Sequence, residues 1–118
     1  MIDDGRPIFE QVAELLERQI LDGSLPEEAQ VPSTNELAAF HRINPATAAK
    51  GINSLVAVQI LYKKRGIGMF VATGAQAQLK TKRRDKFAAE FVTPLLTEAA
   101  KLGITSEQLA DMIRKAGK

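Results

Sequence analysis

The chain has 118 residues, 45% of them hydrophobic and 25% charged, with a formal net charge of +2, which is typical of one ordinary globular domain or two very small ones. It has no cysteine, so disulfide bonds and thiolate metal sites are excluded, and no apolar run is long enough to cross a bilayer. Asp3 and Asp4 stand where a secretion signal has basic residues, so we expect a cytoplasmic protein. We also expect no membrane contact and no metal or other cofactor.

The first predicted helix ends near Gly23, a glycine that can adopt the left-handed conformation common after helix ends. Its apolar residues recur at the spacing of one helical face. We expect this face to supply the third side of a small core. The residues concerned are Ile8, Val12, Leu15, Leu16 and Ile20.

The second predicted helix begins at Thr34, because Ser33 and Glu36 have the spacing of a capping box. The Ser33 hydroxyl can accept a hydrogen bond from the Glu36 amide, and the Glu36 carboxylate can accept one from the Ser33 amide. The preceding proline, Pro32, discourages an earlier start. The helix is expected to end near residues 41–42 and to bury a side made of Leu37, Ala38 and Phe40.

The third predicted helix begins at Pro45, where a missing amide costs nothing, with Asn44 as its cap. It is expected to last to about Val58. Two short helices joined by a turn of a few residues indicate a helix-turn-helix. The apolar face of this third helix consists of Ala48, Ile52, Leu55 and Val56.

The pattern then changes to two runs rich in strand-forming residues, 60–64 and 69–72, on either side of a loop at 65–68. Gly66 and Gly68 are free to take positive φ in this loop. A β-hairpin directly after a helix-turn-helix is the pattern of a winged helix. We therefore predict a mainly α fold with a small β-hairpin, in which a winged-helix domain spans residues 1–73.

Residues 74–118 are predicted to form a C-terminal helical hairpin. The first helix is interrupted by Pro94, where a kink is expected, and it closes at Gly103. Thr105 and Gln108 then form a second capping box. Two apolar stripes follow the first helix, one of Phe87, Phe91, Leu95 and Leu102 and the other of Ala88, Val92, Leu96 and Ala99.

This tail is close to the limit of roughly 40 residues below which a chain rarely folds without staples, metal or association. We expect it to bury its apolar face against a second copy of the chain. The alternative is a monomer whose tail helices fold back on the winged helix. The predicted dimerisation residues are Phe87, Phe91, Val92, Leu95, Leu96, Leu109, Met112 and Ile113.

Charge is segregated along the chain. Residues 1–40 hold two basic and nine acidic side chains, whereas residues 41–86 hold ten basic and one acidic. The basic block covers the third helix, the hairpin and the following segment, which favours contact with a polyanion such as DNA. For the basic run at 80–86 alone, the simpler interpretation is the solvated face of a helix.

Three motifs, taken in order, carry a family resemblance. They are Pro-Ile-Phe-Glu-Gln-Val at residues 7–12, Pro-Ser-x-x-Glu-Leu-Ala at 32–38 and Gly-x-Gly-x-Phe-Val at 66–71. The segment from about Arg6 to Ala72 resembles the amino-terminal DNA-binding domain of the GntR family of bacterial transcription regulators. The run Ile-Asn-Pro-Ala-Thr at 43–47 and the short tail are most similar to the YtrA subfamily.

The resemblance implies a sequence-specific regulator, acting as a repressor, that binds double-stranded DNA as a homodimer. Many family members carry arginine where this chain has Asn35 and Ala49, and a Ser-Arg pair where it has Asn44 and Pro45, so base preference does not transfer. Lys50 is expected to supply part of the missing charge. The predicted DNA-binding residues are Ser33, Thr34, Asn35, Asn44, Ala46, Thr47, Lys50, Arg65 and Gly66.

Two other classes of function stay open: a nonspecific architectural DNA binder, and a winged-helix module that binds an acidic protein. An enzyme is not expected, because His41 is the only histidine and the glycines at 66 and 68 lack the third glycine and helix of a dinucleotide site. For a small effector, if there is one, we expect a site between the tail helices or at their junction with the winged helix.

Overall fold

The computed structural model describes residues 5–117, so Asp3 and Asp4 lie outside the described residues. By its internal contacts the chain forms two compact units, one ending at Lys80 and the other beginning at Thr81. Among the described residues, no helix has the length and apolar character needed to span a membrane. Each unit is described by itself.

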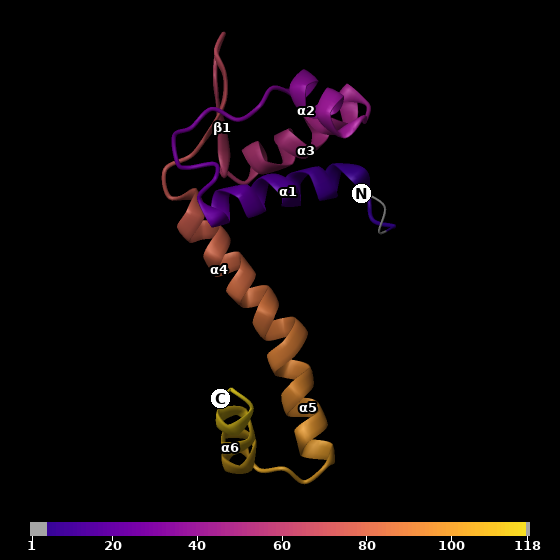
Figure 1. Ribbon diagram of the computed structural model, residues 1–118, viewed down its shortest axis with the longest axis vertical. Helices are drawn as coiled ribbons and strands as arrows, with labels where there is room; N and C mark the ends of the chain where they lie inside the picture. Colours follow the sequence, from indigo (N-terminus) through magenta and orange to yellow (C-terminus); the bar gives the residue numbers. More distant parts are fainter. Residues whose placement is uncertain (1–4, 118) are drawn as a thin grey trace. The chain divides into compact units, whose positions relative to one another are not determined.

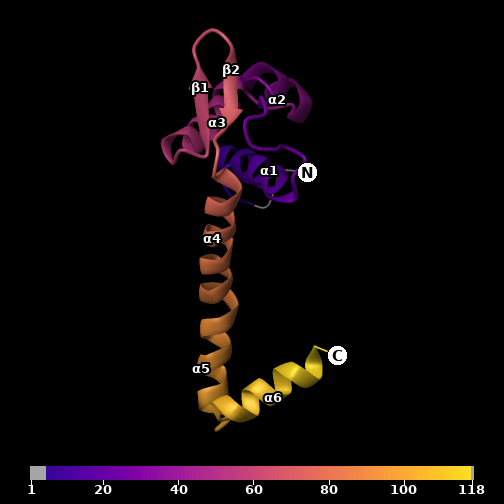
Figure 2. The ribbon, with the colours of Figure 1, turned by 90° about the vertical axis from the view of Figure 1, so that its left-hand side faces the viewer.

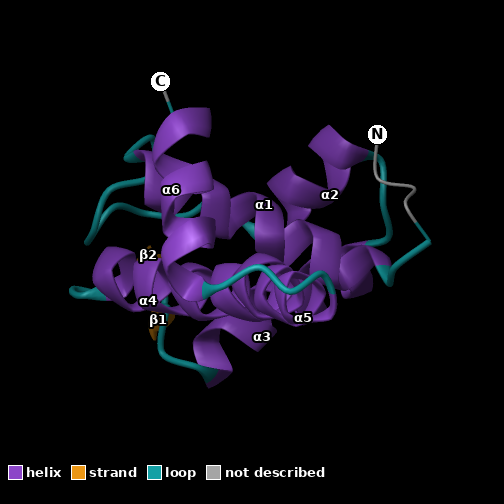
Figure 3. Ribbon diagram, turned by 90° about the horizontal axis from the view of Figure 1, so that it is seen from below, coloured by secondary structure: helices purple, strands orange, loops and turns teal. Residues whose placement is uncertain are grey.

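The order of elements along the chain is shown in Figure 1. Helices make up most of the described chain (Figure 3), and the two strands form one antiparallel hairpin (Figure 2), as the sequence predicted. The elements are α1 (Ile8–Asp22), α2 (Thr34–His41), α3 (Pro45–Ala57), β1 (Leu61–Lys64), β2 (Gly68–Val71), α4 (Ala75–Phe87), the π-helical segment η1 (Ala88–Val92), α5 (Thr93–Lys101) and α6 (Ser106–Ala116).

The core of the first unit forms where α3 packs against α1 and α2. Gly51 allows the close approach of α1, because a Cβ atom at this position would lie 2.8 Å from the backbone oxygen of Phe9. Contributions from all three helices and from both strands close the core. Its most deeply buried side chains include Val12, Leu16, Ile20, Ile52, Ile60, Leu61 and Val71.

Both predicted helix starts are confirmed. The Glu36 amide donates to Ser33 Oγ at 3.1 Å, and the Ser33 amide donates to Glu36 Oε1 at 2.8 Å. At α3, the Ala46 amide donates to Asn44 Oδ1 at 2.8 Å, and Pro45 is the first helical residue. The four to six residues around each start therefore determine where the helix begins.

The prediction that Phe40 is buried is wrong. Leu37 and Ala38 are buried, but the Phe40 side chain is 81% exposed. At 100° per residue, Phe40 projects roughly 110° away from the mean direction of Leu37 and Ala38. It therefore lies on the flank of α2, where its ring contacts that of His41 edge-on with a centroid distance of 4.9 Å.

The hairpin has the expected tight turn. Leu61 pairs with Val71 and Lys64 with Gly68, and the Ile67 amide donates to the Lys64 oxygen at 2.9 Å. Gly66 has φ 77°, the left-handed region that favours glycine. The segment before α2 runs beside β2, because the Val31 amide donates to the Met69 oxygen at 2.8 Å. The wing is thus held against the segment that precedes α2.

The first turns of α4 belong to the first unit by their packing. Ala75 and Leu79 are buried in the same core as α1 and α3. The Gln76 side-chain amide donates to the Leu21 oxygen at 3.0 Å. These contacts lie just beyond residue 73, where the sequence places the domain boundary.

In the second unit the chain stays helical through Pro94. The expected irregularity takes the form of η1, in which the Thr93 amide donates to the Ala88 oxygen five residues earlier. This wider turn gives the proline ring room without ending the helix. Gly103, at φ 71°, and the capping box of Thr105 with Gln108 separate α5 from α6 as predicted.

The helices α5 and α6 diverge from their common turn (Figure 2). They bury little apolar surface, since only Ala99 and Leu109 are buried among the described residues of this unit. Leu109 is therefore covered within the unit, unlike the other predicted dimerisation residues. The remaining seven, which are exposed, are Phe87, Phe91, Val92, Leu95, Leu96, Met112 and Ile113.

Candidate nucleic-acid interface

The nine predicted DNA-binding residues lie on three segments of the first unit: the start of α2, the start and outer face of α3, and the turn of the wing. Seven of them are exposed, and Thr34 and Thr47 are half-buried. Helix caps and a turn place these residues, and the backbone geometry of such features is determined locally. None of the nine is buried, as contact with a macromolecule requires.

At the start of α2, the capping box uses the Ser33 hydroxyl and the Glu36 carboxylate. The amides of Thr34 and Asn35 precede the first intrahelical hydrogen bonds and point out of the helix end, where a phosphate oxygen could accept from them. The Glu36 carboxylate lies at the same helix end and opposes an anion there. Phosphate binding at this helix start therefore depends on support from nearby cations.

A groove of about 590 Å³ lies between the start of α2 and the wing. Gln30 crosses one side of it, donating from Nε2 to the Ile67 oxygen at 3.0 Å. Gly68 makes room for this side chain, because a Cβ atom there would lie 2.7 Å from Gln30 Nε2. Gln30 therefore links the wing turn to the segment that leads into α2, a role that nothing in the local sequence indicates.

The helix α3 separates a buried face from an exposed face. Ala48, Gly51, Ile52 and Leu55 are buried. On the opposite side the exposed residues recur at the spacing of one helical face. They include Asn53, which the sequence analysis did not name although it lies three residues after Lys50. This outer face consists of Ala46, Lys50 and Asn53.

Lys50 does not extend freely into solvent. Its Nζ lies 4.2 Å from the centroid of the Phe9 ring, a cation–π contact between α3 and α1. Phe9 therefore holds the ammonium group at the end of the exposed face nearest α1. The sequence analysis quoted Phe9 as part of the motif at residues 7–12 but assigned it no role.

The wing carries three consecutive cations at its tip. Lys64 lies over the Phe70 ring, with 4.2 Å between Nζ and the ring centroid. Arg65 is exposed and makes no ion pair with any other described residue. Lys63 is also exposed. The turn therefore presents positive charge together with the unhindered backbone of Gly66.

A hydrogen-bonded cluster lies at the base of the wing. Glu28 accepts from Thr73 Oγ1 at 2.6 Å and from the Tyr62 hydroxyl. The hydrogen bond from Thr73 has the larger effect and that from Tyr62 the next, and both lower the pKa of the Glu28 carboxyl. Donation to Glu28 raises the pKa of Tyr62. The cluster joins the segment before α2 to β1 and to Thr73, which lies between β2 and α4, and so links both strands of the wing to that segment.

No group of three or more His, Cys, Asp or Glu side chains among residues 5–117 is arranged to hold a metal ion. The three segments present hydrogen-bond donors at the helix starts and positive charge on α3 and at the wing tip. Both suit a phosphate backbone and the acceptor atoms of base edges.

Comparison with known proteins gives a consistent result. The profile of the family described as "Bacterial regulatory proteins, gntR family" matches residues 8–71. The HTH-type transcriptional repressor YtrA of Bacillus subtilis is 27% identical over 92% of this chain and 83% of its own length. A putative GntR-family transcriptional regulator from Bacteroides thetaiotaomicron has a solved structure with 31% identity and a TM-score of 0.76, over 92% of this chain and 94% of that one.

A third similarity is to AraR(DBD), solved in complex with the operator ORX1. It is 33% identical, with a TM-score of 0.52, over 54% of this chain and 77% of that one. The part of this chain that the family profile matches, residues 8–71, contains α1, α2, α3 and the wing in the order just described.

Proposed function

This chain belongs to the GntR family of bacterial regulatory proteins, and we propose that it is a repressor that binds a palindromic operator as a homodimer. It is a transcription regulator with a DNA-binding domain, and its family and relatives are regulators, not enzymes. The observation that carries the proposal is the placement of three donor-rich segments on one unit, with Gln30 joining two of them.

In the proposed complex α3 enters the major groove. Ala46, Thr47 and Lys50 lie at base edges or at nearby phosphates, and Asn44 lies at the start of the same helix. The amides and hydroxyls of Ser33, Thr34 and Asn35 contact phosphate at the start of α2. Arg65 and Gly66 bring the wing to the adjacent groove.

The dimer is proposed from the second unit. Its exposed apolar residues form a surface of the kind that marks interfaces. A two-fold dimer presents two α3 helices to two half-sites about 10 base pairs apart, or a multiple of that. The segment 74–118 is thus the proposed dimerisation tail. Repression is proposed from the similarity to YtrA, and a cytoplasmic location from contact with the chromosome.

A nonspecific DNA binder is the second candidate. The observation in its favour is the exposed face of α3, which offers the small Ala46 and a Lys50 already in contact with Phe9. Of the three residues of this face, only Asn53 offers the paired donor and acceptor that read a base edge, so most of the face suits phosphate contact better than base readout.

Selection of bound fragments from the source genome, followed by titration of fluorescent DNA, tests the proposal. The selected site should bind far more tightly than a scrambled site of the same length, and affinity for both should fall steeply with salt. Equal affinity for the two sites over the whole salt range would reject the specific repressor and support the nonspecific binder. No binding to either would reject both.

A further inference from the structure

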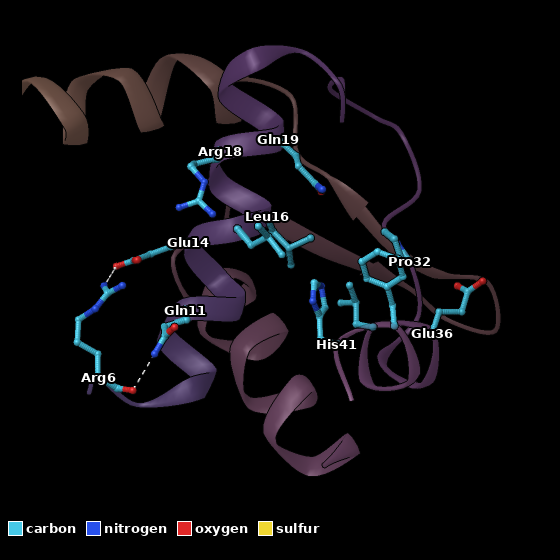
Figure 4. Close-up of a pocket in the computed structure, with 12 residues that line it drawn as sticks. Arg6, Gln11, Glu14, Leu16, Arg18, Gln19, Pro32, Glu36 and His41 are labelled. Atoms are coloured by element: carbon cyan, nitrogen blue, oxygen red, sulfur yellow. Dashed lines mark hydrogen bonds and ion pairs between the residues drawn. The ribbon is translucent and has the colours of Figure 1, made fainter. Parts of the chain in front are cut away.

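A second cavity, of about 720 Å³, lies between α1 and α2 of the first unit (Figure 4). None of the nine proposed DNA-binding residues lines it. Its volume is within the range of small-molecule sites, roughly 300–1,000 Å³. We propose that this cavity binds a small molecule with an apolar body and a carboxylate group.

Apolar side chains from both helices provide the surface for the apolar body. Leu15 and Leu16 come from α1, and Leu37 and Phe40 from α2. Phe40 has the largest exposed fraction of any large hydrophobic side chain among the described residues. A ligand in the cavity would remove part of this ring from water, which is favourable in proportion to the apolar area covered.

The polar groups of the cavity determine the chemistry of the ligand. His41 Nδ1 is buried and has no hydrogen-bond partner, an unfavourable state that a ligand group could relieve. Figure 4 shows the His41 ring directed from α2 toward α1. Arg18, on the α1 side, makes no ion pair with any described residue.

The two carboxylates of the cavity each have a partner and neither pairs with Arg18, whose charge stays available to a ligand, although their own charge opposes an anion close to them, as at the start of α2. Glu14 pairs with the Arg6 guanidinium at 2.5 Å, and Glu36 accepts from the Ser33 amide in the capping box. An anionic ligand group therefore has the Arg18 guanidinium and the unpartnered His41 nitrogen among the groups that line its cavity. This combination favours a carboxylate over a neutral or cationic group.

The cavity is placed to affect DNA binding, an effect that rests on the proposed function. His41 is the last residue of α2, and Arg42, at φ 57°, makes the turn toward α3. The same helix begins with the residues proposed to contact phosphate. A ligand that separates α2 from α1 displaces this helix start, so ligand and DNA should oppose each other's binding.

The test uses 2-naphthoate and its neutral counterpart 2-naphthamide on the full chain. His41 is the only histidine and Tyr62 the only tyrosine, so each gives one set of ring signals in NMR spectra. Naphthoate should move the His41 signals in a saturable manner and leave those of Tyr62, which does not line the cavity, in place. Unmoved His41 signals would overturn the proposal.

Affinity for the two probes identifies the anionic contact. Naphthoate should bind at least about tenfold more tightly than naphthamide, and Arg18→Gln should abolish this difference. Arg114→Gln on α6, which removes the same charge far along the chain, should preserve it. Equal binding of both probes to the wild type would exclude a carboxylate site. If Phe40→Ala dissociates a dimer, the cavity is a contact with a second copy of the chain, and the proposal is overturned as well.

The effect on DNA is measured separately. Naphthoate at a concentration that just saturates the wild type should weaken its binding to the selected site at least about fivefold, and Arg18→Gln should need about tenfold more naphthoate for the same effect. Unchanged affinity in the wild type would overturn the coupling to DNA. A chain that binds naphthoate but no DNA at all would reject the proposed function and leave the ligand site standing.

Discussion

The two units treat their apolar residues in opposite ways. In the unit that ends at Lys80, three helices and the hairpin enclose a continuous core that includes Leu16, Ile52 and Val71. In the unit that begins at Thr81, the only buried residues among those described are Ala99 and Leu109, while Phe91 is 60% exposed. The first unit therefore has the interior of an independent fold, and the second has an exposed apolar surface, which we propose to be an interface.

This difference separates two sources of stability. A closed core stabilises a single chain at any protein concentration, whereas an interface stabilises it only through association, and so depends on concentration. Each variant below distinguishes core from interface, or the interface from the DNA-binding surface.

The largest effect is expected from Ile52→Ala in the core of the first unit. Truncation of a fully buried isoleucine removes transfer free energy and leaves a cavity, at a cost of about 2–5 kcal/mol of unfolding free energy. Chemical denaturation followed by circular dichroism should show this loss equally at low and high protein concentration. A loss that disappears at high concentration would mean that association, not the core, stabilises the first unit.

Phe91→Glu tests the proposed dimer interface of the second unit. An unpaired charge at the proposed interface should disfavour the dimer by several kcal/mol, because burial of an ion costs that much. Sedimentation should detect monomers, and affinity for the selected DNA site should fall far more than nonspecific affinity.

Thr97→Glu is the matched control for Phe91→Glu. It adds the same charge to the same tail, on the side of α5 opposite the apolar stripes, so the dimer should persist. A wild type that sediments as a monomer at high micromolar concentration would refute the proposed dimer outright.

Lys50→Ala tests the proposed DNA-binding surface and changes neither the core of the first unit nor the exposed apolar residues of the second. If Lys50 reads a base, the selected site should lose about 1–3 kcal/mol of binding free energy and preference at that base pair should relax. Phe9→Leu should give a smaller loss, about 0.5–1 kcal/mol, because it removes the cation–π contact but keeps the charge. An equal loss on scrambled DNA would assign Lys50 to phosphate.

The smallest effect is expected from the Glu28 cluster. Hydrogen bonds from Thr73 and Tyr62 lower the pKa of Glu28 in the folded state. Its contribution to stability is therefore present above the pKa of the unfolded state and is lost as the pH falls through the folded-state pKa. Thermal unfolding of Thr73→Val should show a weaker acid dependence than that of the wild type. Identical acid dependence would show that the cluster does not contribute.

The sequence alone determined the features that depend on a few neighbouring residues. The capping boxes at Ser33 and Thr105, the Asn44–Pro45 start of α3 and the glycine turn of the wing are confirmed where they were predicted. Each joins groups two or three residues apart, so its geometry follows from local sequence. Together with the three motifs, these features were enough to predict the winged helix and its family.

The tertiary structure alone decided what distant residues do to one another. Gln30 binds the Ile67 oxygen across 37 residues, Lys50 rests on Phe9, and Leu109 is covered inside the tail. Phe40 is a different case, because at 100° per residue its side chain lies roughly 110° from the mean direction of Leu37 and Ala38, so helical geometry itself places it off the buried face. Contacts between distant residues depend on how closely whole elements approach, as at Gly51, where the absence of one Cβ atom lets α1 and α3 meet.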